Sequence, residues 1–335
     1  MKMGGSANMT KHVLVCGAGS IGKRHIANLL QLGARVTVWR SQIHLLRSIR
    51  DEFNVEVNQN LDDAIDKADA VVVATATDNH IPIATKVLQA NKALFIEKPL
   101  SHDWIGIEDL QQLALGKIVE IGCQFRTHPN LIALSQLLHQ TGNDNILTYH
   151  FAMGHRLDAW RKGKDYHEAY SSDASRGGGA LFDLIHQIDL AIWFFGPVAE
   201  VNAVLSKRSE LDISGDDVSN LLLTHSSGLT GHIQLDMASP VYRCEAEVMT
   251  TNSIFNWSYS QGILYNHTQE GIQIVNQVSK NFERNDLFVK HMDHFLERLS
   301  DNSLSPRCSL QDGIAALRVA ICAREANKSG KKIIV

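Results

Sequence analysis

Up to about residue 125, the chain alternates short apolar runs with longer stretches in which apolar residues recur at helical spacing. The run 70–74 is apolar throughout, which is typical of a strand covered on both faces. Strands that alternate with helices predict right-handed crossovers and a doubly wound parallel sheet. The predicted strands span 12–16, 35–39, 55–57, 70–74, 93–96 and 118–122, and the predicted helices span 21–32, a segment ending near 51, and 79–89.

The pattern changes after residue 126. A strongly apolar helix is predicted over 180–195, ending at Gly196-Pro197, and the segments that follow are short, strand-like and separated by turn residues such as Ser226-Ser227-Gly228. Strands without helices between them predict an α+β domain with a large, mostly antiparallel open sheet. Its predicted strands span 146–153, 198–206, 217–225, 229–237, 243–249, 253–265 and 332–335, and its other helices span 131–139, 286–299 and 309–327.

Composition excludes several classes of protein. The chain has 335 residues, a length that favours two domains, and its net charge of -4 gives no reason to expect nucleic acid or an anionic membrane as a partner. No apolar run approaches the roughly 20 residues that span a bilayer, and residues 1–11 lack the apolar core of a signal peptide. The five cysteines are scattered, which argues against disulfides and a thiolate zinc site. We therefore predict a cytoplasmic protein without a metal.

A Gly-x-Gly-x-x-Gly motif at Gly17, Gly19 and Gly22 follows the first predicted strand and opens the first predicted helix. In this context the glycines allow a tight turn, close approach of a pyrophosphate and packing of helix on strand. An ordinary glycine-rich turn is the alternative. The motif predicts that residues 11–125 form a Rossmann dinucleotide-binding domain, followed by a substrate-binding and oligomerisation domain over 126–335.

The end of the second strand bears on the choice of cofactor. A carboxylate there would bind the ribose 2′-hydroxyl of NAD, but this strand ends in Trp39-Arg40-Ser41. A guanidinium and a hydroxyl suit a 2′-phosphate, so NADP is the preferred cofactor and NAD the alternative. Arg40 could also stack on the adenine or be solvated.

Glu97-Lys98-Pro99 follows the strand at 93–96 and so lies at the carboxyl edge of the sheet, where ligands of open α/β folds bind. A partly buried lysine has a lowered pKa and suits proton transfer. A surface lysine at the end of a strand is the alternative.

The order of these motifs is similar to that of the Gfo/Idh/MocA family, named for glucose-fructose oxidoreductase and inositol 2-dehydrogenase. The resemblance covers about residues 11–335 and rests on the glycine motif, Asn79-His80, Glu97-Lys98-Pro99, and Gly177-Gly178-Gly179 followed by Asp183, His186 and Asp189. It implies that Lys98 lies near the nicotinamide and that His186 is the general acid/base. It also implies a second domain whose open sheet mediates oligomers, here a homodimer or homotetramer.

One feature departs from the family pattern. The family usually has Asp-x-Gly-x-His, whereas Asp183 and His186 are three residues apart with no glycine between them. Both would still share one face of the predicted helix, although the role of Asp183 is in doubt. The alternative is that His186 is a core histidine paired with Asp189. His291 and His294 are predicted to lie on a solvated or interface face of their helix and not to bind metal.

The polar stretch 154–179 is the predicted substrate loop, because charged and aromatic groups combine in one connection. We expect a sugar, cyclitol or sugar nucleotide, oxidised or reduced at a secondary alcohol carbon. A non-catalytic cofactor-sensing protein and a nicotinamide-retaining hydrolase or lyase remain alternatives. The predicted catalytic residues are Lys98, His186 and Asp183; the cofactor residues are Gly17, Gly19, Ser20, Ile21, Gly22, Arg40, Ser41, Thr75, Asn79, His80, Glu97 and Lys98; the substrate residues are Arg126, Trp160, Arg161, Tyr166, Asp183 and His186, with Arg156, Tyr170 and His128 nearby.

Overall fold

The computed structural model of the chain describes residues 10–160 and 165–335. The chain divides into two compact units. The first unit holds the chain up to Glu97 together with Gly106–Gly122 and Phe288–Pro306, and the second holds Lys98–Ile105, Cys123–Leu287 and Arg307–Val335.

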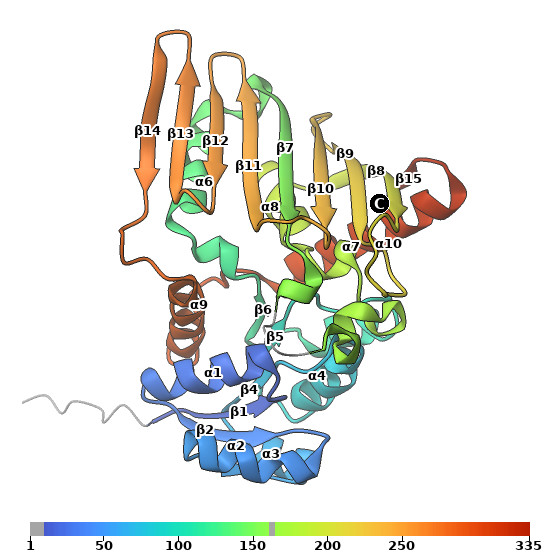
Figure 1. Cartoon of the computed structure of the whole chain (residues 1–335). Coiled ribbons are helices and arrows are strands. Elements are labelled where there is room, and N and C mark those ends of the chain that lie inside the picture. The colour runs from blue at the N-terminus through green and yellow to red at the C-terminus, as the bar shows by residue number, and fades with distance from the viewer. Residues whose placement is uncertain (1–9, 161–164) are drawn as a thin grey trace, which may run out of the picture. The chain divides into compact units, whose positions relative to one another are not determined.

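The first unit is built on a six-stranded sheet in which every pair of neighbouring strands is parallel. Its order is β3-β2-β1-β4-β5-β6, so the winding reverses between β1 and β4 (Figure 1). In such sheets ligands bind beyond the carboxyl ends of the strands at this reversal. The predicted doubly wound fold is therefore confirmed. The strands are β1 (His12–Cys16), β2 (Arg35–Trp39), β3 (Glu56–Val57), β4 (Ala70–Val73), β5 (Ala93–Glu97) and β6 (Val119–Gly122).

Helices surround this sheet, and two of them were not predicted. Asn60 caps α3 by accepting a hydrogen bond from the Asp63 backbone N–H, and two aspartates occupy its first turn. An asparagine followed by acidic residues is a helix-start signal, so α3 was detectable from the sequence. The helices are α1 (Ser20–Gln31), α2 (Leu46–Phe53), α3 (Leu61–Lys67), α4 (His80–Gln89) and α5 (Ile107–Leu113).

The helix α9 (Arg284–Arg298) corrects two predictions. From Phe288 onward it belongs to the first unit, although we placed it in the second domain, because Met292 and Phe295 pack into the core of the parallel sheet. His291 is also buried rather than on a solvated face, with its Nε2 3.0 Å from the Glu120 carboxylate. Arg298 bonds to the same carboxylate, so three buried polar groups satisfy one another.

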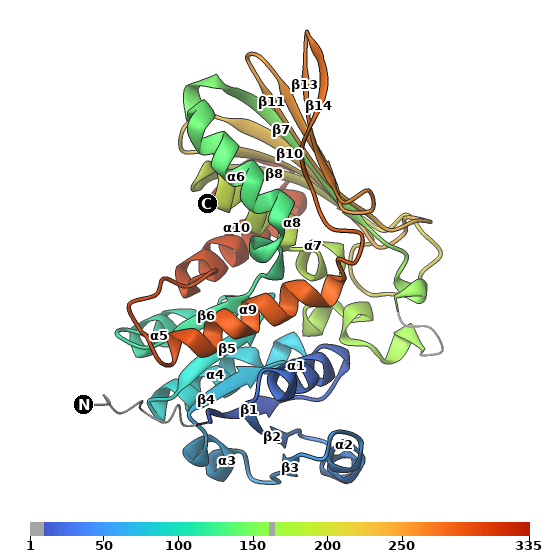
Figure 2. The same ribbon diagram turned by 90° about the vertical axis from the view of Figure 1, so that its left-hand side faces the viewer.

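The second unit is built on a nine-stranded sheet of order β14-β13-β12-β11-β7-β10-β9-β8-β15. Only β7 and β10 pair in parallel, so the predicted mostly antiparallel sheet is confirmed. One face is covered by helices (Figure 2), where α8 contacts β7 and α10 contacts β8. The strands are β7 (Ile146–Gly154), β8 (Val198–Ser206), β9 (Val218–His225), β10 (Thr230–Asp236), β11 (Arg243–Thr250), β12 (Ile254–Ser258), β13 (Ile263–Thr268), β14 (Gly271–Gln277) and β15 (Ile333–Ile334).

The helices of the second unit are α6 (Pro129–Thr141), α7 (Ala180–Asp183), α8 (His186–Phe195) and α10 (Leu310–Ser329). Ser309 and Asp312 form a reciprocal capping box at the start of α10. In the part of the chain that the structure describes, no helix is both long and apolar enough to cross a membrane.

The second unit differs from prediction at three places. The segment predicted as one strand over 253–265 is two strands, β12 and β13, joined by a turn in which Gly262 has a φ of +66°. β14 was not predicted. The apolar helix predicted over 180–195 is likewise two helices, α7 and α8, and this break shapes the functional site.

Candidate functional site

The loop between β1 and α1 contains two glycines that the fold itself requires. Gly17 has a φ of +100°, and a Cβ there would lie 2.6 Å from the backbone oxygen of Ala74. A Cβ on Gly22 would lie 2.1 Å from the backbone oxygen of Gly17, so loop and helix pack too closely for any side chain. These glycines are needed whether or not a ligand binds.

Gly19 is different, because its φ is −72° and a Cβ there would meet no atom within 4 Å. It is the N-cap of α1, which has no side-chain cap and no acidic residue in its first turn, where Ser20 and Ile21 lie. Uncapped N–H groups at a helix start favour an anion. The loop therefore fits the pyrophosphate of a dinucleotide, and glycine at position 19 leaves room for its close approach.

We expect Gly19→Ala to raise the Kd for a nicotinamide dinucleotide about 10-fold or more, because the added methyl group occupies space that the pyrophosphate needs. The melting temperature of the Gly19→Ala variant should stay within about 2 °C of wild type, because the added methyl group contacts no protein atom. Gly22→Ala is the matched control and should lower the free energy of unfolding by about 1–3 kcal/mol. Calorimetry that gives wild-type affinity for Gly19→Ala would refute the phosphate role of this loop.

Arg40 and Ser41 follow β2, and no carboxylate accompanies them. Arg40 is half-buried and donates to the side chain of Gln42, and burial lowers the pKa of its guanidinium. Ser41 is exposed. Both residues are positioned as the sequence predicted, beyond the carboxyl end of the strand.

Thr75, Asn79 and His80 lie after β4, but they differ in what their side chains can do. The Thr75 hydroxyl is shielded from solvent and has no hydrogen-bond partner among the described residues. His80 is buried, with its Nε2 3.2 Å from the backbone oxygen of Thr75, and Asn79 donates to Asp78. Among the described residues, Thr75 is therefore the one of the three with a buried side-chain polar atom that lacks a partner.

The structure does not support a direct cofactor contact by the Glu97 side chain. Glu97 is buried, and its Oε1 lies 2.7 Å from His25 Nε2. Gly122 packs against this carboxylate, since a Cβ there would lie 2.9 Å from it. The Glu97 side chain, which we predicted to contact the cofactor, therefore links the end of β5 to α1 within the first unit.

Lys98, the next residue, belongs to a polar cluster in the second unit. Its Nζ donates to the backbone carbonyl of Asp183 at 2.7 Å. The Asp183 side chain is buried, and its Oδ1 accepts a hydrogen bond from the Tyr170 hydroxyl at 2.9 Å. The structure thus brings Lys98 and Asp183 together and adds Tyr170 from the predicted substrate loop.

The break between α7 and α8 makes the Lys98 contact possible. The backbone N–H of Gln187 donates to the backbone oxygen of Leu184 at 3.4 Å. In a continuous α-helix it would donate to the backbone oxygen of Asp183, four residues earlier. That carbonyl accepts from Lys98 instead. Asp183 and His186 consequently lie on separate helices, rather than on one helical face as predicted.

Asp216 is a positioning residue that we did not predict. Its backbone carbonyl accepts from the N–H of Ala180 at 2.8 Å, and its carboxylate accepts from the N–H of Leu181 at 2.9 Å, so it caps α7. Burial is the main influence on this carboxyl group and raises its pKa. The signal in the sequence was weak, because the capping residue follows the helix by 35 positions.

His186, at the start of α8, is only 3% exposed. Its ring lies 4.9 Å from that of Phe125, and the Gln124 amide nitrogen is 3.4 Å from its Nε2. Its Nδ1 has no hydrogen-bond partner among the described residues. Burial, and then the charges of Lys98 and Arg284, hold the pKa of His186 well below its usual value, so the imidazole is neutral at pH 7. A neutral imidazole can act as a base.

Arg126 was predicted to bind the substrate, but its side chain is taken up by partners within the protein. It is buried, and its guanidinium forms two-donor hydrogen bonds to Asp189, the shortest at 2.7 Å. Asp312 and the backbone oxygen of Arg307 accept from the same group. Asp189 therefore pairs with Arg126 rather than with His186, which removes the alternative in which His186 and Asp189 form a core pair.

The predicted substrate loop is only partly organised around the cluster. The Trp160 indole N–H donates to the backbone oxygen of His155 at 2.8 Å, and their rings are nearly parallel. Tyr166 stacks on His167, and its hydroxyl accepts from the N–H of Asp212. Among the described residues of this loop, Tyr170 contacts Asp183 of the cluster, and Arg161 lies outside the described residues.

The fold also brings together cysteines that are far apart in the sequence. Cys123 and Cys308 lie with Asp189 in a buried group whose ligand atoms are within 4.8 Å of one another. Burial raises the pKa of the Cys308 thiol, and Arg126 already holds the Asp189 carboxylate. The Cys308 thiol also donates to Asp189 Oδ1 at 3.7 Å, so hydrogen bonds hold this buried group together.

Both units match known family models. Residues 11–123 match GFO_IDH_MocA, an oxidoreductase family with an NAD-binding Rossmann fold, and residues 133–256 match the GFO/IDH/MocA C-terminal domain. The uncharacterized oxidoreductase YrbE of Bacillus subtilis (strain 168) is 24% identical over 353 residues, which cover 98% of each chain. An inositol 2-dehydrogenase of Acidothermus cellulolyticus is 29% identical over 160 residues, 46% of this chain and 42% of its own.

Solved structures share the fold over nearly the whole chain. GenD2 from gentamicin A biosynthesis, in complex with NAD, has a TM-score of 0.83 at 22% identity and covers 100% of this chain and 99% of its own. Levoglucosan dehydrogenase in complex with NADH and levoglucosan has a TM-score of 0.87 at 17% identity, covering 98% and 100%. UDP-N-acetylglucosamine 3-dehydrogenase GnnA from Acidithiobacillus ferrooxidans has a TM-score of 0.79 at 18% identity, covering 96% and 99%. The resemblance that the motifs predicted is confirmed, and the chain belongs to the Gfo/Idh/MocA family of oxidoreductases, with an NAD-binding Rossmann domain.

Proposed function

We propose that this chain is an NAD(P)-dependent dehydrogenase or reductase that acts on a secondary alcohol carbon of a sugar, a cyclitol or a sugar nucleotide. The observation that carries the proposal is the cluster of Lys98, Asp183 and the neutral His186. A base and a fixed cation are the groups that alcohol oxidation requires. Relatives named for inositol, levoglucosan and UDP-N-acetylglucosamine support a carbohydrate-like substrate.

Each residue of the cluster has a separate task. A bound nicotinamide supplies the chemistry of hydride transfer. His186 takes the hydroxyl proton during oxidation and returns it during reduction. The Lys98 ammonium stabilises the negative charge that develops on the same oxygen, and the Asp183 carbonyl holds that ammonium in place. Tyr170 fixes the Asp183 carboxyl group.

The test is a panel of sugars, cyclitols and sugar nucleotides, each assayed with both cofactors by the absorbance of reduced nicotinamide. We expect net, continuing change in absorbance with at least one compound. A static spectrum of bound nicotinamide would favour a hydrolase or lyase with an internal redox cycle. Absence of any nicotinamide signal would favour a binding protein, and either result would overturn the proposal.

We further propose that NADP is the preferred cofactor, because the tip of β2 carries Arg40 and Ser41 in place of a carboxylate. Arg40→Ala should raise the KM for NADP about 10-fold or more and leave the KM for NAD nearly unchanged, since only NADP carries the 2′-phosphate. Steady-state kinetics with both cofactors measure this preference. An unchanged ratio of the two KM values would show that Arg40 does not bind the phosphate.

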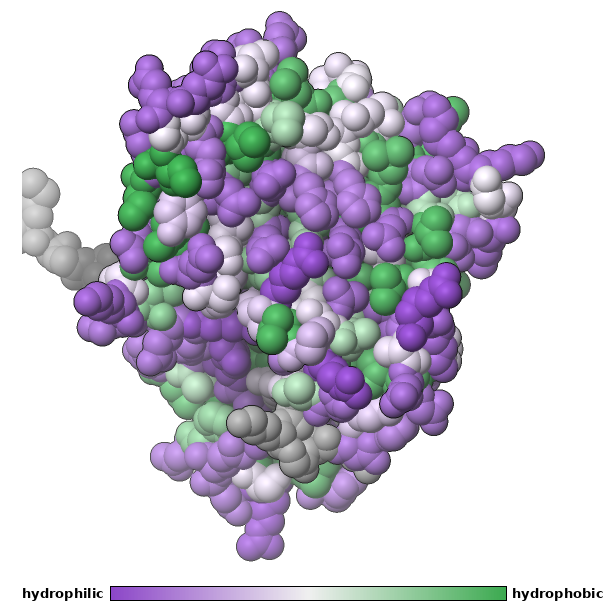
Figure 3. Space-filling view, turned by 45° about the horizontal axis from the view of Figure 1, so that its top comes forward, coloured by the Kyte–Doolittle hydropathy of each residue, from purple (hydrophilic) through white to green (hydrophobic). Residues whose placement is uncertain are grey.

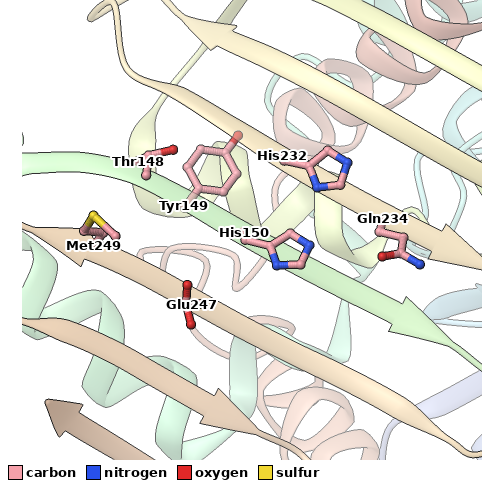
Figure 4. A pocket seen from close by; sticks show the side chains of 7 residues that line it. All are labelled: Thr148, Tyr149, His150, His232, Gln234, Glu247 and Met249. Carbon is pink, nitrogen blue, oxygen red and sulfur yellow. The ribbon is translucent and has the colours of Figure 1, made fainter.

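The uncovered face of the nine-stranded sheet is the proposed oligomer interface. Exposed apolar side chains of this unit, including Val204, Leu222, Ile272 and Ile274, lie on its strands among polar ones, and Figure 3 shows polar and apolar residues interspersed. A pocket over β7, β10 and β11 is lined by His150, His232 and Glu247, among others (Figure 4). Light scattering should give the mass of a homodimer or homotetramer.

A further inference from the structure

A row of aromatic rings runs through the second unit from the substrate loop to His186. Neighbouring ring centroids along it are 4.9 to 6.4 Å apart. The row brings together the carboxyl end of β7 and the start of β11, which pair at Gly154 and Arg243. The rings are, in order, those of Trp160, His155, Tyr242, Tyr259, Phe125 and His186.

Arg284 places a positive charge on this row. Its guanidinium carbon lies 5.8 Å from the centroid of the Tyr242 ring. Its charge also lowers the pKa of His155, the second ring of the row, and of His186, the last ring. Arg284 therefore lies over one ring of the row and acts on the proposed base through its charge.

Arg284 has no counterion in the part of the chain that the structure describes, where neither an ion pair nor a hydrogen bond of its side chain is found. Three other arginines of this unit have a carboxylate partner: Arg126 pairs with Asp189, Arg156 with Asp158 and Arg243 with Glu245. The side chain of Arg284 is exposed, so it can reach a ligand. An unpaired guanidinium over an aromatic ring, in a row of rings that ends at a neutral base, has the chemistry of an anion-binding position.

A second cation, Lys98, also supports an anion-binding role for this part of the unit. Lys98 donates to a backbone carbonyl, and its charge also acts on His186. The carboxyl group of Asp183 could balance the charge of one of the two cations, Lys98 and Arg284, and not of both. A neutral polyol would gain little from a second positive charge, whereas a carboxylate or phosphate matches the two-donor geometry of a guanidinium.

We propose that Arg284 binds a carboxylate or phosphate group of the substrate, so that the enzyme acts on an acidic or phosphorylated sugar in preference to a neutral one. The aromatic row supports this role, because its half-buried rings, those of Trp160, Tyr242 and Tyr259, offer apolar surface to a sugar while Arg284 holds the charged group. The inference rests on the proposed dehydrogenase function and names the substrate class of the same site.

The test compares neutral and anionic forms of the same sugar on the cofactor-loaded protein. Glucose, glucuronate and glucose 6-phosphate form one set, and galactose, galacturonate and galactose 6-phosphate form another. Turnover is measured by nicotinamide absorbance and binding by calorimetry, for wild type, Arg284→Gln, Arg284→Lys and Arg47→Gln. Arg47 is an exposed arginine of α2 in the first unit and serves as the matched control.

We expect an anionic member of a set to bind at least about 10-fold more tightly than its neutral counterpart. Arg284→Gln should remove this preference by raising KM with little change in kcat, Arg284→Lys should retain part of it, and Arg47→Gln should retain all of it. A preference for carboxylate over phosphate, or the reverse, identifies the charged group. Equal binding of neutral and anionic sugars, no binding of either, or equal loss of both in Arg284→Gln would overturn the inference.

The two proposals fail in different ways. Anion-selective binding that depends on Arg284 but gives no turnover would overturn the dehydrogenase function and leave the anion site standing. Turnover of neutral sugars without a preference for anionic ones would overturn the anion site and leave the dehydrogenase function standing.

Discussion

His186→Ala is expected to lower kcat at pH 7 by about 100-fold to 10,000-fold, because it removes the group that takes the proton of the substrate hydroxyl. Binding of the dinucleotide should be unchanged, since the glycine loop belongs to the other unit. His150→Ala, at an imidazole in the pocket of the nine-stranded sheet, is the matched control and should keep wild-type kcat. A fully active His186→Ala variant with native circular dichroism would refute the assignment.

The pH dependence offers a separate check on the same residue. Because the pKa of His186 lies well below its usual value, the imidazole is already neutral at pH 6.5 and above. Activity should therefore hold as pH falls from 8 to 6.5 and be lost only as pH falls through the lowered pKa. A profile of kcat/KM that already declines above pH 7 on its acid side would contradict a base in this environment.

Lys98→Ala is expected to lower kcat/KM by about 100-fold to 1,000-fold, because the ammonium that stabilises the developing charge is lost. The same change should raise the pKa of His186, since the charge of Lys98 lowers it. The acid limb of the pH profile should then move to higher pH. This second readout separates an electrostatic role from a loss of packing.

Two further variants complete the Lys98 experiment. Lys98→Arg keeps the positive charge, so it should keep the acid limb near its wild-type position even if the altered shape lowers the rate. Lys290→Ala removes an exposed lysine of α9 and should change neither parameter. An acid limb that does not move in Lys98→Ala would show that Lys98 does not act on His186.

Local rules of sequence were sufficient for most elements of the two sheets. Apolar runs such as β4 and alternating runs such as β9 identify strands because burial on one or both faces imposes the pattern directly. The same rules did not separate β12 from β13, because apolar and aromatic residues continue through the turn and Gly262 is the main signal of a break. They also missed α3, although Asn60 and the following acids marked its start.

The partners of buried charged groups were not predictable in this way. Arg126 and Asp189 are 63 positions apart, and Glu120 is 171 positions from His291. Arg126 was assigned to the substrate site and His291 to a solvated or interface face of its helix, because the sequence around each residue does not contain the distant partner. Burial then decided the outcome, since a buried charge requires a counterion and takes the one that the fold brings near.

The sequence by itself determined the glycine loop, the lysine that follows β5 and the histidine in the apolar segment, because turn geometry and hydrophobic periodicity depend on neighbours along the chain. Only the tertiary structure decided that the apolar segment breaks after Asp183, that Asp216 caps its first part, and that Arg284 has no counterion among the residues that the structure describes. These depend on which backbone and side-chain groups meet across the fold. Hydrogen bonds and ion pairs between residues far apart in the sequence depend on how the fold places them, and the hydrophobic pattern along the chain does not identify such partners.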